Sequence, residues 1–392
     1  MQGGVGDVRA QAQAGAAALR AGEPGRARAV FQSLVDAGRA DSQIWLGLAY
    51  AARDLNDATG KLEALDRALG LDPHNIRALL LKADHFEGAG DEKGAAACYR
   101  SALKSAGAGG RVTPDLEPDL RRAQAKMAAY AARFEAHLRE RLAAQGFTET
   151  GATRRFAQSL DLLVGRKQVY QQQPRFYYFP ELPQIQFYER ADFPWMATLE
   201  AQTDVIRDEL LEVLKDEGAF TPYVEPQAFR EGKDPYGLLG NPDWSAFYLW
   251  KEGRRVDANA DRCPRTVAAL EAAPLARIPG RTPMLLFSLL RPGARIPPHT
   301  GYLNARLICH LPLIVPPGCA LRVGNEVREW REGEALVFDD TMEHEAWNHS
   351  DRLRVVLLFD IWRPELTEEE RGLVSAMVQA VDDYGAGSGD WD

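Results

Sequence analysis

A repeat with a period of 34 residues is the feature that most limits how this chain can fold. Phe31, Leu65 and Tyr99 stand at that spacing within alanine-rich segments. Turn residues recur in the same phase, at Gly22-Glu23, Asn56-Asp57 and Gly90-Asp91. Pro73 ends the second unit, because proline lacks the amide hydrogen that a continuing helix needs. Each unit is therefore predicted to be a pair of helices, stacked on its neighbours.

These units resemble the tetratricopeptide repeat. The segments ARDLNDATGKLEALDRALGLDP and GDEKGAAACYRSALKSA carry its pattern of small residues, with an aromatic residue in the second and the terminal proline in the first. The first unit lacks the proline, and the second has Leu65 where the motif has an aromatic residue. Stacked helix pairs form a concave surface that can bind a protein partner. The alternative is that the units only pack on the neighbouring domain.

Composition excludes several classes of protein. A chain of 392 residues is longer than a domain with one hydrophobic core usually is, which favours two domains. The net charge of -9 argues against binding to nucleic acid. Four cysteines without CxxC spacing do not form a disulfide framework, which favours a cytoplasmic location. No apolar run is long enough to span a membrane, and no secretory signal precedes the repeats.

The expected architecture is α+β, with helical repeats followed by a double-stranded β-helix of the jelly-roll or cupin-like kind. Five strand-length segments rich in branched and aromatic residues support the second part: 285–293, 305–315, 320–330, 334–340 and 352–362. The predicted divisions are repeats at 1–106, a linker and connecting helix at 107–150, the jelly roll at 151–366 and a C-terminal tail at 367–392. A long helix is expected over 119–144 in the connecting part.

Four of the seven histidines fall between His299 and His349, within the strand-rich part. His299 follows two prolines at the expected entry of a strand, and His344 follows an acidic run at the expected entry of another. Two imidazoles carried by different strands can converge on one divalent metal ion. This pair is the candidate metal site.

Arg354 lies ten residues beyond His344 and is surrounded by apolar residues. A guanidinium on a core strand keeps its charge and needs a compensating anion, and its planar shape suits a carboxylate. The alternative is that Arg354 faces solvent beside Arg352, since the two share one face of a regular strand.

The segments PPHTG, RLICHL, FDDTMEHEAWN and DIWRPEL resemble the aspartyl/asparaginyl beta-hydroxylase family, and the likeness continues upstream through WSAFYLWKEGRR and FPWMATLE. Members of that family are Fe(II)- and 2-oxoglutarate-dependent dioxygenases. Eukaryotic members also carry helical repeats ahead of the oxygenase. The resemblance therefore covers both parts of the chain.

The resemblance implies that His299 and His344 bind the iron and that no carboxylate does, because Gly301 stands where most such oxygenases have that ligand. Asp340 is implied to hold a metal-bound water. Ser288 and Arg354 are implied to bind the distal carboxylate of 2-oxoglutarate, which reacts with O2.

His310 is implied to lie near this cosubstrate, and Trp244 and Arg306 to contact the substrate. Two departures leave the substrate open, since Leu286 and Ile308 stand where members acting on protein aspartate have basic residues. A peptide, a small molecule and a lipid all remain candidate substrates. Two other interpretations also remain: a jelly roll that binds without turnover, and a cupin-type metalloprotein that does not use 2-oxoglutarate.

Overall fold

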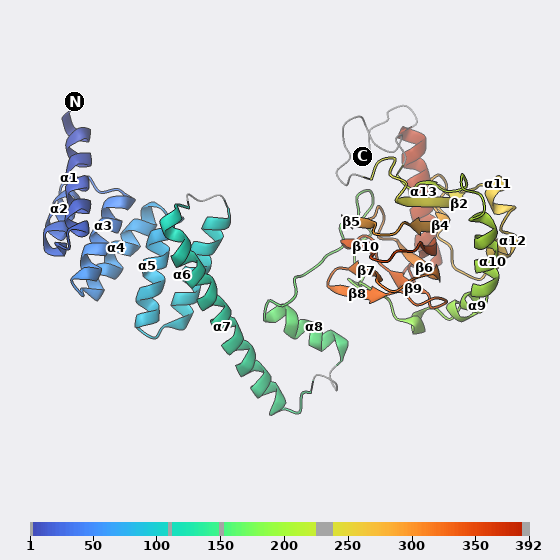
Figure 1. Cartoon of the computed structure of the whole chain (residues 1–392), viewed down its shortest axis with the longest axis horizontal. Coiled ribbons are helices and arrows are strands. Elements are labelled where there is room, and N and C mark those ends of the chain that lie inside the picture. Colours follow the sequence, from blue (N-terminus) through green and yellow to red (C-terminus); the bar gives the residue numbers. More distant parts are fainter. Residues whose placement is uncertain (1–2, 109–111, 149–152, 225–237, 386–392) are drawn as a thin grey trace. The chain divides into compact units, whose positions relative to one another are not determined.

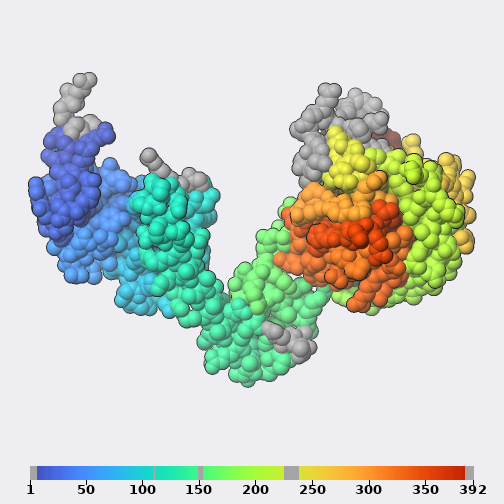
Figure 2. Space-filling view, in the orientation of Figure 1, coloured from blue at the N-terminus to red at the C-terminus, as the bar shows by residue number. Residues whose placement is uncertain are grey.

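A computed structural model describes residues 3–108, 112–148, 153–224 and 238–385 of the chain (Figure 1). The chain divides into two compact units, Met1–Arg166 and Lys167–Asp392. The division lies beyond residue 151, where the jelly-roll domain is expected to begin. Each unit is a continuous packed body in the space-filling view (Figure 2). Across the described residues, no helix combines the length and the apolar character that crossing a bilayer requires.

The first unit is helical. Its elements are α1 (Gly3–Arg20), α2 (Pro24–Asp36), α3 (Ser42–Asp54), α4 (Ala58–Leu71), α5 (Ile76–Gly88), α6 (Glu92–Gly107), the short turn η1 (Pro114–Leu116), α7 (Glu117–Ala143) and α8 (Arg154–Leu163). Helices α1 to α6 pack as three consecutive pairs. The long helix predicted over 119–144 is α7.

The repeat spacing has a physical cause in the turns between paired helices. Gly22, Asn56 and Gly90 all adopt the left-handed backbone, with φ of 73°, 58° and 77°, which glycine and asparagine tolerate best. In the second and third pairs the next residue, Asp57 or Asp91, then caps the following helix by accepting a backbone N–H. The three residues at the repeat spacing are buried: Phe31, Leu65 and Tyr99. The predicted helical repeat is confirmed.

The second unit contains two antiparallel sheets and several helices. Its helices are η2 (Arg190–Asp192), α9 (Met196–Glu200), α10 (Thr203–Val213), α11 (Asp257–Ala260), α12 (Pro264–Ala269) and α13 (Glu368–Gly385). Its strands are β1 (Thr221–Pro222), β2 (Trp244–Lys251), β3 (Arg254–Arg255), β4 (Leu285–Leu290), β5 (Arg295–His299), β6 (Arg306–Ile314), β7 (Cys319–Val323), β8 (Glu326–Glu329), β9 (Leu336–Phe338), β10 (His344–Asn348) and β11 (Arg354–Trp362). The α+β class is confirmed.

The larger sheet has the order β1-β2-β4-β11-β6-β9, with β3 paired to β2, and the smaller has the order β5-β10-β7-β8. Residues on one face of the larger sheet pack against helices such as α10, and those on the other face pack against the smaller sheet. Both faces are therefore buried, which explains why β11 reads as an almost unbroken apolar run. In β11, Val355, Leu357 and Phe359 face the helices, whereas Val356 and Leu358 face the smaller sheet.

Five of the described strands lie outside the five predicted segments: the two-residue strands β1 and β3, and the longer strands β2, β5 and β10. Strand β5 contains Pro297 and Pro298, which weaken a strand pattern, and it can accept them because it is an edge strand. His299 is the last residue of β5, so the expectation that it stands at a strand's entry is wrong. Strands β5 and β10 are antiparallel, so His299 at the end of β5 lies opposite His344 at the start of β10.

The predicted C-terminal tail begins with helix α13, which buries Val374 and Val378 against the second unit. Residues 386–392 of the tail lie outside the described part of the chain.

Candidate active site

A cavity of about 220 Å³ lies between the two sheets of the second unit. All eight residues that the sequence singled out line it: Trp244, Ser288, His299, Arg306, His310, Asp340, His344 and Arg354. They come from six strands, β2, β4, β5, β6, β10 and β11, and from the loop after β9. The two sheets thus bring together residues that are up to 110 positions apart in the sequence.

The two histidines lie side by side. His299 and His344 are opposite each other in the β5–β10 pair, and their ring centroids are 4.1 Å apart. Nδ1 of His299 lies 2.8 Å from the carbonyl oxygen of Pro297, and Nδ1 of His344 lies 3.1 Å from that of Met342. A carbonyl only accepts, so each Nδ1 carries the proton and each Nε2 keeps a lone pair.

Burial lowers the pKa of His299 to about 3 and that of His344 to about 4. Both imidazoles are therefore neutral at pH 7, which is the form that binds a metal ion. Within the described residues, no cluster of three histidine, cysteine, aspartate or glutamate side chains has metal-binding geometry. A metal bound here would have the two imidazoles as its protein ligands.

Asp340 occupies the space beside Gly301. A Cβ atom at position 301 would lie 2.0 Å from Oδ2 of Asp340, which is far inside van der Waals contact. The backbone N–H of Gly301 also donates to the carbonyl oxygen of Asp340 at 2.7 Å. The carboxylate of Asp340 therefore fills the place that a side chain at 301 would take, and a larger residue there would require Asp340 or the backbone to move.

Arg354 is a buried cation without a carboxylate partner among the described residues. It is 1% exposed, and its guanidinium lies 4.8 Å from the ring centroid of Trp330. One nitrogen, Nη1, donates to the carbonyl oxygen of Ser288 at 3.2 Å, while Nε has no hydrogen-bond partner. Burial lowers its pKa to about 10, so the charge persists at pH 7. Such a charge needs a bound anion.

The open question about Arg352 is settled by the same strand. Arg352 precedes β11 and is exposed, whereas Arg354 is the first residue of β11 and points between the sheets. The two arginines therefore do not share a solvent-facing surface.

Several polar side chains line the same cavity as Arg354. The indole N–H of Trp244 donates to the hydroxyl of Ser288 at 3.2 Å. Trp244 also stacks on Tyr223, with ring centroids 3.9 Å apart. His310 is buried, and burial together with the charge of Arg354 lowers its pKa well below the usual value. Its Nδ1 has no hydrogen-bond partner. Uncharged donors and one cation thus face the same part of the cavity.

Arg306 has a different environment. It donates to Oδ2 of Asp340 at 3.0 Å, and its Nε lies 3.2 Å from Oδ1 of Asp360. Burial opposes the charge on Arg306, but the two carboxylates outweigh this effect and raise its pKa. Burial raises the pKa of Asp360 to about 6. These ion pairs neutralise Arg306, whose contact with a substrate stays a prediction.

Sequence reasoning missed Asp360 and Arg175, which also line the cavity. Asp360 lies on β11, six residues after Arg354, and the alternation of a strand places both on one face. That spacing could have identified it. Arg175 lies in a proline- and aromatic-rich segment without strand or helix periodicity, so no local signal marks it.

A model of the family described as aspartyl/asparaginyl beta-hydroxylase matches residues 200–364. The human aspartyl/asparaginyl beta-hydroxylase is 38% identical over 183 residues, which cover 46% of this chain and 22% of that protein. An ornithine lipid ester-linked acyl 2-hydroxylase of Rhizobium tropici is 39% identical over 180 residues, which cover 45% of this chain and 60% of that protein. The chain thus spans less than two thirds of the length of either relative.

Two solved helical structures are similar to the first unit. PcrH from Pseudomonas aeruginosa is 24% identical, with a TM-score of 0.28, over 31% of this chain and 90% of that chain. The Sgt2 TPR domain from Aspergillus fumigatus is 18% identical, with a TM-score of 0.28, over 31% of this chain and 80% of that chain. The family match over residues 200–364 agrees with the resemblance drawn from the sequence. Residues 200–364 of the second unit are thus similar to the aspartyl/asparaginyl beta-hydroxylase family.

Proposed function

We propose that the second unit is an Fe(II)- and 2-oxoglutarate-dependent dioxygenase that hydroxylates an unactivated carbon. The observation that carries this proposal is Arg354, a buried cation without an acidic partner in the described residues, in the same cavity as two neutral imidazoles. A dicarboxylate could bind the metal ion with one end and neutralise the guanidinium of Arg354 with its other carboxylate. The hydroxylase names of the relatives support the same chemistry.

In this proposal His299 and His344 hold the iron through Nε2, and the carbonyl oxygens of Pro297 and Met342 fix the rings. When bound, iron, O2 and 2-oxoglutarate supply the oxidant that converts a C–H bond into C–OH, with release of succinate and carbon dioxide. The cavity is buried between the sheets, which keeps bulk water away from the reacting groups.

The remaining side chains orient the reactants. Arg354 and Ser288 would bind the distal carboxylate of 2-oxoglutarate, and the indole N–H of Trp244 turns the Ser288 hydroxyl proton toward that carboxylate. His310 lies beside Arg354 as a neutral group. Asp340, anchored by Arg306, would accept a hydrogen bond from water beside the histidines.

The substrate remains open between peptide, small molecule and lipid. One relative is named as an aspartyl/asparaginyl hydroxylase and another as a lipid acyl hydroxylase. In this chain Ile308 lines the cavity, and Leu286 is buried between the sheets next to it. Ile308 therefore offers apolar surface to a substrate, whereas Leu286 is fully buried behind the cavity lining.

Anaerobic titration tests the proposal. Iron bound to the protein should give a metal-to-ligand charge-transfer band when 2-oxoglutarate is added, and His344→Ala should remove both iron binding and the band. A cupin-type protein that does not use 2-oxoglutarate would bind iron without the band, and a non-catalytic jelly roll would bind neither. Succinate release by the His344→Ala variant would exclude this histidine as a ligand.

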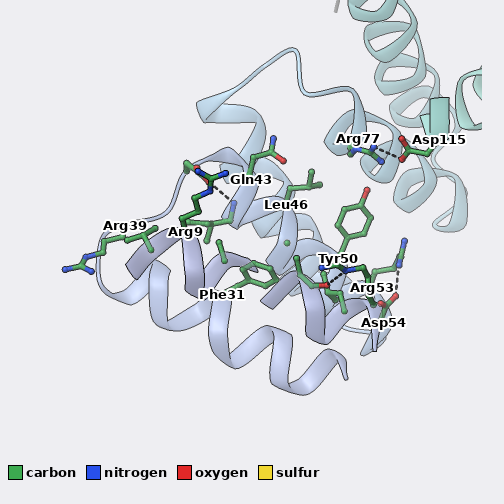
Figure 3. A pocket seen from close by; sticks show the side chains of 18 residues that line it. Arg9, Phe31, Arg39, Gln43, Leu46, Tyr50, Arg53, Asp54, Arg77 and Asp115 are labelled. Carbon is green, nitrogen blue, oxygen red and sulfur yellow. Dashed lines mark hydrogen bonds and ion pairs between the residues drawn. The ribbon is translucent and has the colours of Figure 1, made fainter. Parts of the chain in front are cut away.

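A second candidate function concerns the first unit. A groove of about 1250 Å³ opens among helices α1, α2, α3 and α5, with Phe31 and Tyr50 among its lining residues (Figure 3). Five arginines and three aspartates line it: Arg9, Arg20, Arg39, Arg53, Arg77, Asp41, Asp54 and Asp115. Arg53 and Arg77 are paired with Asp54 and Asp115, and Arg39 lies 3.9 Å from Asp7. The excess of arginines would complement a protein partner that presents an acidic segment.

Peptide binding to the full chain tests this second candidate. A fluorescent glutamate-rich peptide should bind more tightly than its glutamine-rich counterpart, and Arg9→Gln with Arg39→Gln should remove the difference. Arg26→Gln serves as control, because Arg26 is an exposed arginine of α2 outside the groove. Equal binding of the two peptides would contradict an acidic partner.

A further inference from the structure

Three arginines line the cavity of the second unit, and they differ in charge compensation. Arg306 is paired with Asp340 and Asp360, so it offers little net charge to a ligand. Arg354 is assigned to the cosubstrate by the proposed function. Arg175 is the third. Among the described residues, no carboxylate lies within ion-pair distance of it.

The surroundings of Arg175 fix its guanidinium at the cavity wall. Its Nε–H donates to the carbonyl oxygen of Thr300 at 2.7 Å, and its backbone N–H donates to that of Gly301 at 3.0 Å. The guanidinium lies 4.9 Å from the ring centroid of Tyr302. Its position is therefore set by the three residues that follow the metal-ligand candidate His299. The terminal nitrogens Nη1 and Nη2 make neither of these two hydrogen bonds.

The cavity also has an apolar wall. Met284, Ile308 and Leu358 line it on the side of the larger sheet. A ligand that fits both features has an anionic group near Arg175 and an uncharged part against this wall. Because Arg175 is exposed, an anion bound to it would stay partly in water.

We infer that Arg175 is a specificity-determining residue, which binds a carboxylate or phosphate group of the substrate at the edge of the cavity. The inference rests on the proposed function for the identity of the reaction, but not for the presence of the anion site. Arg175 lies upstream of the residues that the family model matches. The uncharged part of the substrate, with the carbon to be hydroxylated, lies against Met284, Ile308 and Leu358.

Matched ligand pairs test the inference by direct binding. The probes are blocked aspartyl and asparaginyl peptides, decanoate and decanamide, and decyl phosphate and decanol. Binding of each is measured by calorimetry on the full chain, loaded anaerobically with iron and saturated with 2-oxoglutarate. The anionic member of at least one pair should bind the wild type about tenfold more tightly than its neutral member, as expected for charge-assisted hydrogen bonds. The pair that shows the preference identifies the source of the anion.

Variants separate the anion site from a structural effect. Arg175→Gln should remove the preference and leave the neutral member's affinity unchanged, and Arg175→Lys should retain part of it. Arg291→Gln is the matched control, because Arg291 is also exposed and donates through Nε to a carbonyl oxygen, but does not line the cavity. It should keep the full preference.

Two results would overturn the inference. One is equal binding of both members of every pair by the wild type, including no binding at all. The other is a preference that survives in Arg175→Gln. Both leave the charge-transfer band intact, so the proposed function would stand. Conversely, the wild type could prefer the anionic ligands yet give no charge-transfer band. That result would support the anion site and contradict the proposed oxygenase function.

Discussion

The two ends of the cavity contain buried arginines in opposite electrostatic states. At one end Arg354 is buried, and no carboxylate of the described residues forms an ion pair with it. At the other end Arg306 contacts two carboxylates. Both arginines come from adjacent strands of the larger sheet, β11 and β6. A compensated charge belongs to the fold, whereas an uncompensated one destabilises the empty protein until an anion binds. The difference distinguishes a structural arginine from a ligand-binding one.

The sharpest test of this difference is Arg306→Met. The substitution leaves Asp340 and Asp360 buried without a cation, so the free energy of unfolding should fall by about 3–5 kcal/mol. Chemical denaturation monitored by circular dichroism measures this. Adding Asp340→Asn and Asp360→Asn to the same variant should recover most of the loss. A stable Arg306→Met protein would show that the ion pairs do not hold this end together.

Arg354→Ala should have the reverse effect. Removing a buried cation without a partner should leave the ligand-free protein at least as stable, while 2-oxoglutarate should bind about a hundredfold more weakly. Iron binding should not change. Anaerobic titration of the charge-transfer band gives the affinity, and Arg352→Ala is the control because Arg352 is exposed. A large loss of stability in Arg354→Ala would mean that Arg354 is structural after all.

Gly301→Ala tests the close contact between Gly301, two residues after His299, and Asp340, which pairs with Arg306. The added methyl group would meet the carboxylate of Asp340 at 2.0 Å, so Asp340 or the backbone must move. We expect a cost of about 2 kcal/mol in unfolding free energy, as for an overpacked core. Combining it with Asp340→Gly should relieve the clash. No change in thermal stability for the single variant would indicate that the carboxylate moves freely.

The smallest effect is expected for Trp244→Phe at the Arg354 end. This change removes the hydrogen bond to Ser288 but keeps an aromatic ring against Tyr223. The loss of one neutral hydrogen bond, about 1 kcal/mol, should weaken 2-oxoglutarate binding about fivefold. Ser288→Ala should produce a similar decrease, and the double variant should add little. Additive losses would mean that the two side chains act independently.

Local patterns in the sequence were enough for much of the fold. The 34-residue spacing predicted the helix pairs, because left-handed turns and helix caps depend on neighbouring residues. Apolar runs predicted β4, β6, β9 and β11, which are buried between layers. The apolar pattern did not predict β5 and β10, the strands that carry His299 and His344, because prolines and polar residues interrupt it there. The jelly-roll assignment itself stays a prediction.

The sequence by itself determined which residues would gather, since all eight candidates line one cavity. Only the tertiary structure decided what each of them contacts. Arg352, Arg354 and Arg306 look alike in a strand pattern, yet one is exposed, one is buried alone and one is buried with two carboxylates. The physical reason is that compensation of a buried charge depends on residues brought close by strand pairing. Asp340 and Asp360, which neutralise Arg306, lie 34 and 54 positions away along the chain.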